Sequence, residues 1–325
     1  MSGIEVLAPG LLTTVQAGGR EGLRHLGVGL GGALDPDTHA IANLLVGNAA
    51  SAATLEIALA GPTLRFAHPA RIALCGAAFE GDIDGESLPG WRRVDIPAGS
   101  VLRIGGCREG ARAWLAVAGG IRMAEVLGSA STDLRGGFGG VEGRALRVGD
   151  RLRVEPFADA VERVRIAPWW IDPHALDPPA PMPIRVLPGD DATDPADGLF
   201  EREWTLAAAS DRQGLRLDGG SLALRDAREY VSEPIVPGTV QLPPGGQPIV
   251  LLADAQTHGG YPRIGHVIRA DRGRLAQLRA GERLRFAPCT RAQALAAARE
   301  RAHTLAKIAL AIQSRSEFGP RDRSW

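Results

Sequence analysis

The chain contains little lysine and little cysteine, and each shortage excludes a class of protein. Among its 325 residues there is one lysine, Lys307, although Lys and Arg together number 37. Schiff-base chemistry and the P-loop both depend on a lysine, so a chain with one lysine has few residues that could serve in either. The three cysteines, Cys75, Cys107 and Cys289, are far apart and show no CxxC spacing. We therefore expect neither a zinc site nor a disulfide framework. We expect the chain to be in a reducing environment.

A net charge and long apolar runs are also absent. Asp and Glu number 37, which balances the basic residues and gives a formal net charge of zero, whereas a general nucleic-acid binder needs a basic excess. The opening MSGIEVLAPG has no basic region followed by an apolar core, and no stretch approaches the length of a transmembrane helix. We therefore expect a cytoplasmic chain without a signal peptide, and neither nucleic acid nor a membrane as a partner.

Glycine and proline are abundant, with 42 and 23 residues, and they separate many short apolar or β-branched runs. This pattern favours a mostly β architecture of the sandwich or barrel type over βαβ units. The expected strands are 13–16, 63–66, 71–75, 93–96, 101–104, 113–118, 151–154, 184–187, 249–252, 263–269 and 283–286.

Three helices are expected beside these strands. Asp35 can cap a helix that has Pro36 at its first position and stops at Gly47. A short helix covers 272–279. The longest begins at Thr290 and carries apolar residues on one face, namely Leu295, Ala298, Leu305, Ile308 and Ile312.

Repeated edges divide the chain into two related β-domains. Residues 4–10 (IEVLAPG) resemble 184–189 (IRVLPG), and 149–156 (GDRLRVEP) resemble 281–288 (GERLRFAP). We take this as a weak internal duplication, although G-[DE]-x-L is also an ordinary turn-plus-strand sequence. The expected domains are 1–156 and 184–289, joined by a proline-rich linker at 157–183 and followed by a C-terminal helix and polar tail at 290–325.

The densest group of polar side chains lies within 246–271, GQPIVLLADAQTHGGYPRIGHVIRAD. An apolar run ends on Asp254, a polar Gly-rich loop follows, and a second strand from Arg263 to Ala270 is expected to run back as a hairpin. Glycine pairs allow close approach of another group, so the loop is a plausible place for a small polar ligand. The alternative is a hairpin whose polar groups satisfy its own backbone.

Two further Gly-rich stretches could hold an anion. In 13–35, Arg20 could face an anion, but Asp35 would repel one at the helix start, so capping is the preferred role for Asp35. In 128–140, GSASTDLRGGFGG offers hydroxyls, a guanidinium and backbone amides suited to an oxyanion. A mobile connection between strands explains the second stretch equally well. The motifs GxSxG, HExxH and Walker A are absent from the sequence.

Seven ordered motifs together resemble one family along residues 4–298. They are VQ-x-GGR, GALD, ANLLVGN, LEIALAGPTLRF, GSASTDLRGGFGGVEGRAL, SDRQGLRLDG and LLADAQTHGGYPRIGHVI. The family is variously called allophanate hydrolase subunit 2, KipI antagonist or biotin-dependent carboxyltransferase-like. Within it, the STDL and ADAQT-x-GGYPRI forms look most like the C subunit of bacterial ATP-dependent 5-oxoprolinase. The resemblance implies two tandem cyclophilin-like β-barrel domains.

The resemblance also implies an enzyme complex. Its partners would be a KipI-like protein (the B subunit) and a LamB/YcsF-like protein (the A subunit), and its reaction the ATP-driven opening of 5-oxo-L-proline to L-glutamate. ATP and Mg²⁺ would be held by the complex, and we expect no metal ligand on this chain. One alternative is carboxyl transfer from carboxybiotin, as in urea carboxylase, which would need a separate biotin carrier. Another is a non-enzymatic module that binds a KipI-like partner.

Site residues are assigned from side-chain chemistry within the matching motifs. Asp254 is the candidate general base or metal-contacting carboxylate, and hydrogen-bonding side chains would orient the substrate. The catalytic set is Asp254, Gln256, Thr257 and Tyr261. The substrate- or anion-binding set is Arg20, Ser131, Thr132, Arg135, His258 and Arg263. The structural set is Asp35, Asn43, Asn48 and Glu56.

Two positions depart from the family pattern. Ala17 stands where the family usually has Asp, which removes a carboxylate. His258 stands where it usually has Thr, which adds a titratable group. If the missing carboxylate is catalytic in relatives, activity here is in doubt; if it only orders the loop, Gly18 and Gly19 can tolerate its loss.

Overall fold

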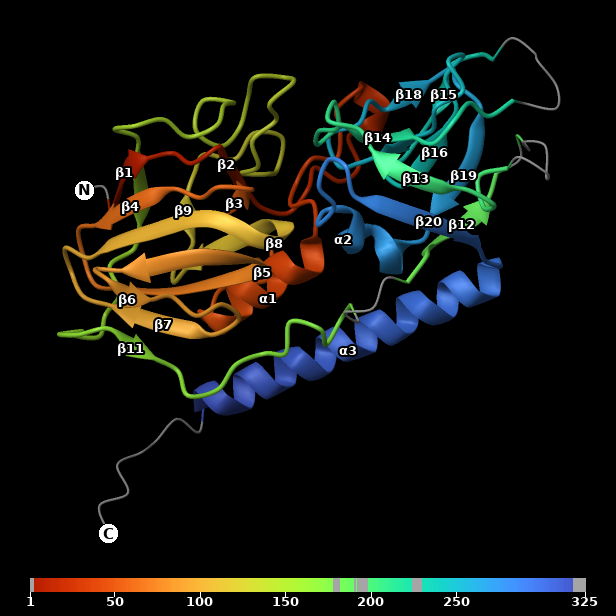
Figure 1. Ribbon diagram of the computed structural model, residues 1–325. Coiled ribbons are helices and arrows are strands. Elements are labelled where there is room, and N and C mark those ends of the chain that lie inside the picture. The colour runs from red at the N-terminus through yellow and green to blue at the C-terminus, as the bar shows by residue number, and fades with distance from the viewer. Residues whose placement is uncertain (1–2, 178–181, 190, 192–197, 224–229, 318–325) are drawn as a thin grey trace.

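The strands of the computed structural model form two units that lie side by side above one long helix (Figure 1). Residues 3–177, 182–189, 191, 198–223 and 230–317 are described; the predicted linker prolines at 178, 179 and 181 and the polar tail at 318–325 lie outside them. The first unit is an 11-stranded sheet and the second a closed seven-stranded barrel. The mostly β prediction is therefore confirmed.

The 11-stranded sheet is built around two long strands that pair with each other. Its order is β11-β7-β5-β8-β4-β1-β10-β9, with β2 joined through β3 to β8, and β6 joined to β5. The strands are β1 Ile4–Ala8, β2 Leu12–Gln16, β3 Thr54–Ala58, β4 Thr63–Phe66, β5 Ala70–Ile83, β6 Glu86–Ser87, β7 Arg93–Ile96, β8 Val101–Val117, β9 Ile121–Arg122, β10 Arg151–Val154 and β11 Arg165–Ile166.

Strand β8 replaces two of the predicted strands, 101–104 and 113–118. The intervening GGCREGAR looks like a loop in the sequence, yet it stays extended because β5 pairs with β8 along most of its length. The register shifts three times between Gly76 and Gly81, so bulges absorb the irregular residues without ending the ladder.

The closed barrel has the order β12-β19-β16-β17-β14-β13-β20. Its strands are β12 Ile184–Pro188, β13 Glu203–Leu206, β14 Gly214–Asp218, β16 Thr239–Gln241, β17 Ile249–Leu251, β19 Arg263–Val267 and β20 Arg283–Pro288, and a separate ribbon pairs β15 Glu233–Pro234 with β18 His258–Gly259.

Two strand arrangements differ from the expectation. First, β17 and β19 do not form a hairpin: β16 lies between them and pairs with both. Second, among the described strands only those of the second half close into a barrel, whereas the path in the first half runs between two ends, β11 and β9. The similar edges also pair differently, because β1 and β10 are antiparallel while β12 and β20 are parallel.

The helices begin where the sequence places their caps. Helix α1 spans Pro36–Leu45, and Asp35 accepts hydrogen bonds from the N–H groups of Asp37 and Thr38, as predicted. The second helical region is shorter than expected, with η3 at Arg269–Asp271 and α2 at Arg272–Leu275. A short 3₁₀ helix, η1, covers Arg24–Leu26.

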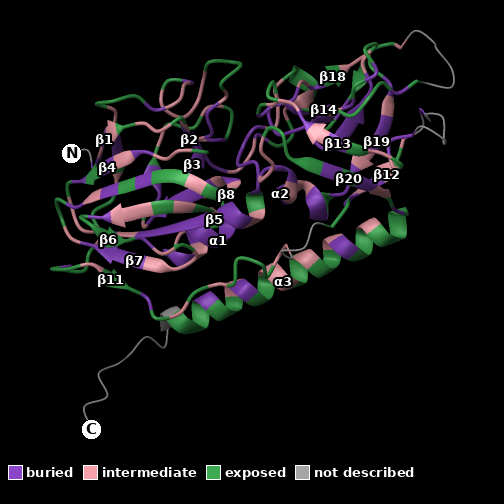
Figure 2. Cartoon of the chain, viewed as in Figure 1, coloured by how far each residue is buried: buried purple, intermediate pink, exposed green. Residues whose placement is uncertain are grey.

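Helix α3, Arg291–Glu317, runs beneath both units (Figure 1). Thr290 and Gln293 form a reciprocal capping box at its start, with N···O distances of 2.8 and 3.2 Å. Most of the helix is exposed, while Ala297, Ile308 and Ile312 are buried (Figure 2). Among the described residues, no helix combines the length and apolar character that a bilayer crossing needs.

Hydrophobic packing joins the two units. One core cluster lies within the 11-stranded sheet. Another is continuous from α1 and the buried Trp114 of β8 to the barrel residue Trp204 and to Ile308 of α3. Burying a large apolar side chain contributes about 1.5–3 kcal/mol, so the shared cluster holds the sheet, the barrel and α3 as one body.

Arg301 fastens α3 to α1 through charge. Its guanidinium contacts Asp37, lies 3.0 Å from Asp177 and 4.0 Å from Asp35. Asp35 is buried against α2, where a Cβ on Gly273 would come within 2.9 Å of its carboxylate. Burial raises the pKa of Asp35 to about 6, although the Thr38 hydroxyl and Arg301 favour its charged form.

This raised pKa predicts a pH-dependent stability difference for Asp35→Asn. The stability that Asp35 contributes is fully present below its ordinary pKa of 3.8 and is lost as the pH rises through about 6. Asn keeps the cap and does not titrate. The free energy of unfolding of D35N relative to the parent chain should therefore rise across this window, by roughly 3 kcal/mol, and stay level above it.

Urea unfolding at a series of pH values measures this difference. The matched control is Asp218→Asn, at the exposed end of β14. This variant makes the same Asp-to-Asn change at an exposed position and so measures the effect of the substitution itself. If the difference in unfolding free energy between D35N and the parent chain does not change with pH, the raised pKa of Asp35 is contradicted.

Candidate functional site

The loop at residues 17–34 crosses from the sheet to the barrel and forms the seam between them. Gly31 donates its N–H to the carbonyl of Ala253 at 2.9 Å, one residue before Asp254. Arg24 donates to the carbonyl of Ile235. This loop therefore reaches the polar stretch around residues 254–263, which comes from the other half of the sequence.

A buried arginine links the two units at the centre of the seam. Arg212, which precedes β14, donates from Nε and Nη2 to the two carboxylate oxygens of Asp254 at 2.8 and 3.0 Å. Its Nη1 pairs with Glu56 of β3, and Nη2 also donates to the carbonyl of Gly32 at 2.6 Å. The three charged side chains are each about 5% exposed or less. One guanidinium thus serves carboxylates from both halves of the chain.

The remaining contacts of Glu56 complete this buried group. Its Oε2 accepts hydrogen bonds from Trp114 Nε1 and from the N–H of Leu34, both at 3.0 Å. Arg112 of β8 lies 3.9 Å from its Oε1. Two arginines and two carboxylates therefore balance, as buried charges must. We call Glu56, Arg112, Arg212 and Asp254 the seam ion cluster.

Burial and charge pull the pKa values of the cluster in opposite directions. Burial opposes ionisation of Glu56, but Arg212 and Arg112 outweigh it and hold the pKa of Glu56 below its ordinary value. Burial raises the pKa of Asp254, which Arg212 only partly offsets. For Arg212, the two carboxylates outweigh burial and raise its pKa. Pairing with Arg212 therefore favours the charged forms of both carboxylates.

The predicted catalytic residue Asp254 is thus held in a fixed ion pair. Both of its oxygens accept from Arg212, and the residue is 9% exposed. A carboxylate in this position fixes the start of the loop that follows it. The general-base assignment of Asp254 stays a prediction.

The predicted anion ligands of the first half lie together, below the surface. Arg20 is 1% exposed and donates from Nε to the carbonyl of Val126 at 3.0 Å and from Nη2 to that of Ser131 at 2.6 Å. Its guanidinium lies 4.7 Å from the ring centre of Phe138. The remaining Nη1 is buried and has no hydrogen-bond partner among the described residues.

The unpaired Nη1 is a donor that Arg20 does not use among the described residues. Burial lowers the pKa of Arg20, while Asp133 and Asp254 offset part of that effect. An unpaired buried donor costs about 1–3 kcal/mol, and an acceptor on a ligand would remove that cost.

Ser131 and Thr132 use their hydroxyls to hold strand β2. Ser131 Oγ accepts from the N–H of Ala17 at 2.9 Å, and Thr132 Oγ1 donates to the carbonyl of Val15 at 2.9 Å. Both residues are fully buried. Their substrate-binding role stays a prediction, and the contacts shown are with the backbone. Ala17, where the family usually has Asp, is itself buried beside Ser131.

The second-half residues present a more open surface. Thr257 is buried, and its Oγ1 lies 2.9 Å from Nδ1 of the exposed His258. Tyr261 is 45% exposed. Gln256 is half-buried, and no side-chain partner is found for it among the described residues. Arg263 forms an ion pair with Glu233 of β15.

A cavity of about 340 Å³ opens beside the seam ion cluster, and we call it the seam cavity. Asp254 and Arg212 form part of its wall, and the exposed Arg135 lies at its lining. Of the ten predicted catalytic and binding residues, only Asp254 and Arg135 line this space. The other eight lie outside it.

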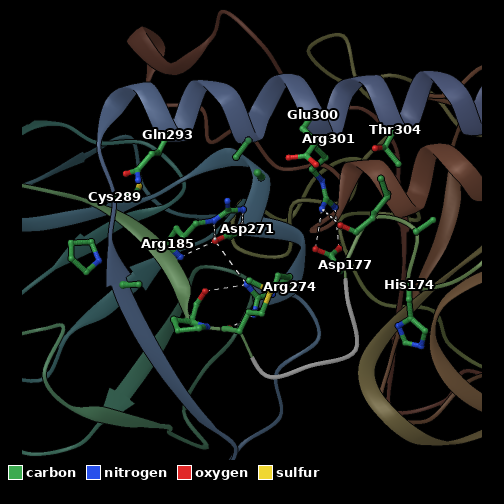
Figure 3. Close-up of a pocket in the computed structure, with 18 residues that line it drawn as sticks. His174, Asp177, Arg185, Asp271, Arg274, Cys289, Gln293, Glu300, Arg301 and Thr304 are labelled. Atoms are coloured by element: carbon green, nitrogen blue, oxygen red, sulfur yellow. Dashed lines mark hydrogen bonds and ion pairs between the residues drawn. The ribbon is translucent and has the colours of Figure 1, made fainter.

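A second cavity, of about 660 Å³, lies between α3 and the barrel (Figure 3). Four of the charged side chains that line it form two ion pairs: Arg185 lies 2.6 Å from Asp271, and Arg301 lies 3.0 Å from Asp177. None of the predicted catalytic and binding residues lines it. This space belongs to the attachment of α3.

The four residues assigned to the structural set make many internal contacts. Asn43 donates to the carbonyl of Ala52 at 2.8 Å, and Asn48 donates to that of Val117 at 2.8 Å. Asp35 caps α1. Glu56 belongs to the seam ion cluster, so its place is more central than the sequence indicated.

Two members of the cluster were not singled out from the sequence. Arg212 lies within SDRQGLRLDG, a matching motif, and Arg112 is one of many arginines in β8 and its neighbours. The scarcity of lysine makes arginine so common here that spacing alone does not mark either one. Across the described part of the chain, no group of three or more His, Cys, Asp and Glu residues is placed to hold a metal ion.

The family described as carboxyltransferase domain, subdomain A and B, matches residues 26–288. The chain therefore belongs to this carboxyltransferase family. It is 40% identical to the 5-oxoprolinase C subunit of Escherichia coli (strain K12), over 94% of this chain and 97% of that protein. The corresponding protein of Haemophilus influenzae is 37% identical, over 87% and 90%. Within the family, the chain thus groups with the 5-oxoprolinase C subunits, which confirms the resemblance.

The fold has a counterpart among solved structures. The crystal structure of the Kluyveromyces lactis urea amidolyase superposes with a TM-score of 0.84 at 26% identity, over 94% of this chain and 20% of that one. This fold is therefore also used as one part of a much longer enzyme.

We expect the loss of Arg212, which belongs to the seam ion cluster, to lower the free energy of unfolding more than the loss of an exposed arginine. Arg212→Met leaves Glu56 and Asp254 buried with too little positive charge, so we expect a loss of about 3–5 kcal/mol in the free energy of unfolding. Arg283→Met removes a 72% exposed partner of Glu203, so its loss should be at most about 1 kcal/mol. Urea unfolding of both variants compares them, and equal losses would contradict a stabilising role for the cluster.

Proposed function

We propose that this chain is the C subunit of an ATP-dependent 5-oxoprolinase, which opens 5-oxo-L-proline to L-glutamate. The observation that carries the proposal is the 40% identity to a 5-oxoprolinase C subunit over nearly the full length of both chains. Its partners would be a KipI-like protein (the B subunit) and a LamB/YcsF-like protein (the A subunit), in the cytoplasm. The chain would be active only within that complex.

The substrate's ring amide is unreactive, so ATP would be used to phosphorylate the carbonyl oxygen and create a leaving group. In the described part of the chain, no group of three or more acidic, cysteine and histidine residues is placed to hold a metal ion. We therefore assign binding of Mg²⁺ and ATP to the complex as a whole and derive no step through the metal.

The chain's own contribution would be to bind and orient. The unpaired Nη1 of Arg20 supports the role of anion donor, because a charged donor in a desolvated site interacts strongly. Gln256, Thr257 and Tyr261 would direct hydrogen bonds to the substrate from the loop that Asp254 fixes. Precise positioning of this kind accounts for a large part of many rate enhancements.

Carboxyl transfer from carboxybiotin is the second candidate. The match to a carboxyltransferase domain and the fold shared with urea amidolyase favour it. Biotin would have to arrive on a separate carrier, since the one lysine, Lys307, lies within α3 rather than in a Met-Lys attachment motif.

We also propose that both halves are cyclophilin-like units of 1–156 and 184–289, separated by a linker at 157–183. The closed barrel of the second half supports this for that half. In the first half, β11 lies within the proposed linker and pairs with β7, so the sheet of that half continues past residue 156.

Reconstitution tests the activity. The chain is mixed with its KipI-like and LamB/YcsF-like partners from the same organism, and ADP release is followed with and without 5-oxo-L-proline. We expect ADP release that depends on the lactam and on all three proteins. A stable complex without lactam dependence would contradict the proposal and leave carboxyl transfer or a purely regulatory role.

The loop assignments predict a selective loss of turnover. Gln256→Ala and Tyr261→Phe change side chains that are half-buried or exposed, so stability should change by no more than about 0.5 kcal/mol. Turnover of the complex should fall by roughly tenfold or more, the value of one lost hydrogen bond in the transition state. The matched control is Gln247→Ala, an exposed glutamine before β17, which should keep full turnover. Normal turnover in Q256A and Y261F would reject their assignment.

A further inference from the structure

The seam cavity carries features of a binding site that the proposed substrate loop does not explain. Its lining omits Arg20 and every residue of the 256–263 loop. A volume of about 340 Å³ falls within the range of small-molecule sites, which combine an apolar lining with a few placed polar groups.

Three leucines give the cavity an apolar rim. Leu11, Leu59 and Leu134 line it and are 66%, 41% and 37% exposed. Leu11 and Leu59 flank the β2–β3 pair, whereas Leu134 comes from the Gly-rich 128–140 stretch. Exposed leucines that gather around one opening mark a place where an apolar group can be covered.

The backbone at Leu59 is held in a strained conformation. Its φ is 60°, in the left-handed region that non-glycine residues seldom adopt. Hydrogen bonds from its N–H to the carbonyl of Ala111 and from the N–H of Cys107 to its own carbonyl, at 2.9 and 2.7 Å, maintain it. Strain of this kind costs about 1–3 kcal/mol and is concentrated at functional sites. Here it presents a leucine side chain at the rim.

The polar side of the cavity is positively charged. Four arginines, Arg112, Arg135, Arg212 and Arg279, line it together with two aspartates, Asp211 and Asp254. Arg112, Arg212 and Asp254 belong to the seam ion cluster, whose charges balance with Glu56. Asp211 accepts hydrogen bonds from the N–H groups of Gln213 and Gly214, so the excess positive charge comes from Arg135 and Arg279.

Two of these arginines are fixed and one is free to move. Arg279 donates to the carbonyl of Cys107 at 2.9 Å, and Arg112 donates to that of Ala276 at 2.8 Å. Arg135 is exposed, and its guanidinium has no partner among the described residues. A rigid cationic wall beside a mobile cation suits an anionic group that enters from solvent.

We propose that the seam cavity binds a small organic carboxylate with an apolar body. The apolar part lies against Leu11, Leu59 and Leu134, and the carboxylate faces Arg135 with Arg279 behind it. The proposal concerns this chain alone and does not depend on the 5-oxoprolinase activity.

The test uses the full chain without partners or ATP. The probe is 4-(trifluoromethyl)benzoate, followed by fluorine NMR, and its neutral counterpart is 4-(trifluoromethyl)benzamide. We expect saturable binding of the benzoate, and binding of the benzamide roughly tenfold weaker, which corresponds to about 1.4 kcal/mol. Equal affinity for the two probes, or no saturable binding of the benzoate, would overturn the proposal.

Three variants locate the probe. Arg135→Gln should reduce benzoate affinity about tenfold while leaving the benzamide unchanged. Leu59→Asn should weaken both probes; Asn tolerates a positive φ, so the backbone conformation is kept. The control is Arg153→Gln, an exposed arginine of β10 away from the cavity, which should bind like the parent.

Thermal unfolding of each variant verifies that it is folded. Benzoate binding that persists unchanged in both R135Q and L59N would place the probe elsewhere and overturn the proposal. Equal weakening by R135Q and R153Q would show a general charge effect and would also overturn it.

Discussion

The ion pair between Arg212 and two carboxylates, Glu56 and Asp254, is the interaction on which the seam depends. Burying charges costs several kcal/mol for each ion, and good geometry with full hydrogen bonding is needed to offset it. Here both oxygens of Asp254 and both oxygens of Glu56 have donors. Arg212 and Asp254 both belong to the barrel half, whereas Glu56 belongs to the sheet, so the pair between Glu56 and Arg212 forms only when the two units are docked.

Local signals in the sequence predicted much of the secondary structure. Asp35, Pro36 and Gly47 marked α1 because capping acts over a few residues, and Thr290 marked the start of α3 in the same way. Pairing between distant segments was harder. The β17–β19 hairpin was wrong because the three residues of β16, over 239–241, lie between the two strands. That arrangement depends on closure of the barrel rather than on any local pattern.

In the candidate site, too, local features could be predicted from the sequence and contacts between distant residues could not. The polar loop at 254–263 was found because its composition is unusual for a chain segment between buried strands. The partner of Asp254 was not found, since Arg212 precedes it by 42 residues and looks like any other arginine. Ser131 and Thr132 were assigned to a ligand from their hydroxyls, whereas the structure shows those hydroxyls bonded to Ala17 and Val15. Side-chain chemistry thus indicated where polar groups gather, and the fold decided which of them are already engaged.

The separation between Glu56 and Arg212 has a consequence for biosynthesis. Arg212 lies 156 residues after Glu56, which a ribosome adds in about 8–30 s at its usual rate of roughly 5–20 residues per second. During that interval Glu56 has Arg112 of its own sheet as a cationic neighbour, but not yet Arg212. The first half can therefore satisfy one oxygen of Glu56 through Leu34 and Trp114, whereas the pairing with Arg212 waits for the barrel half.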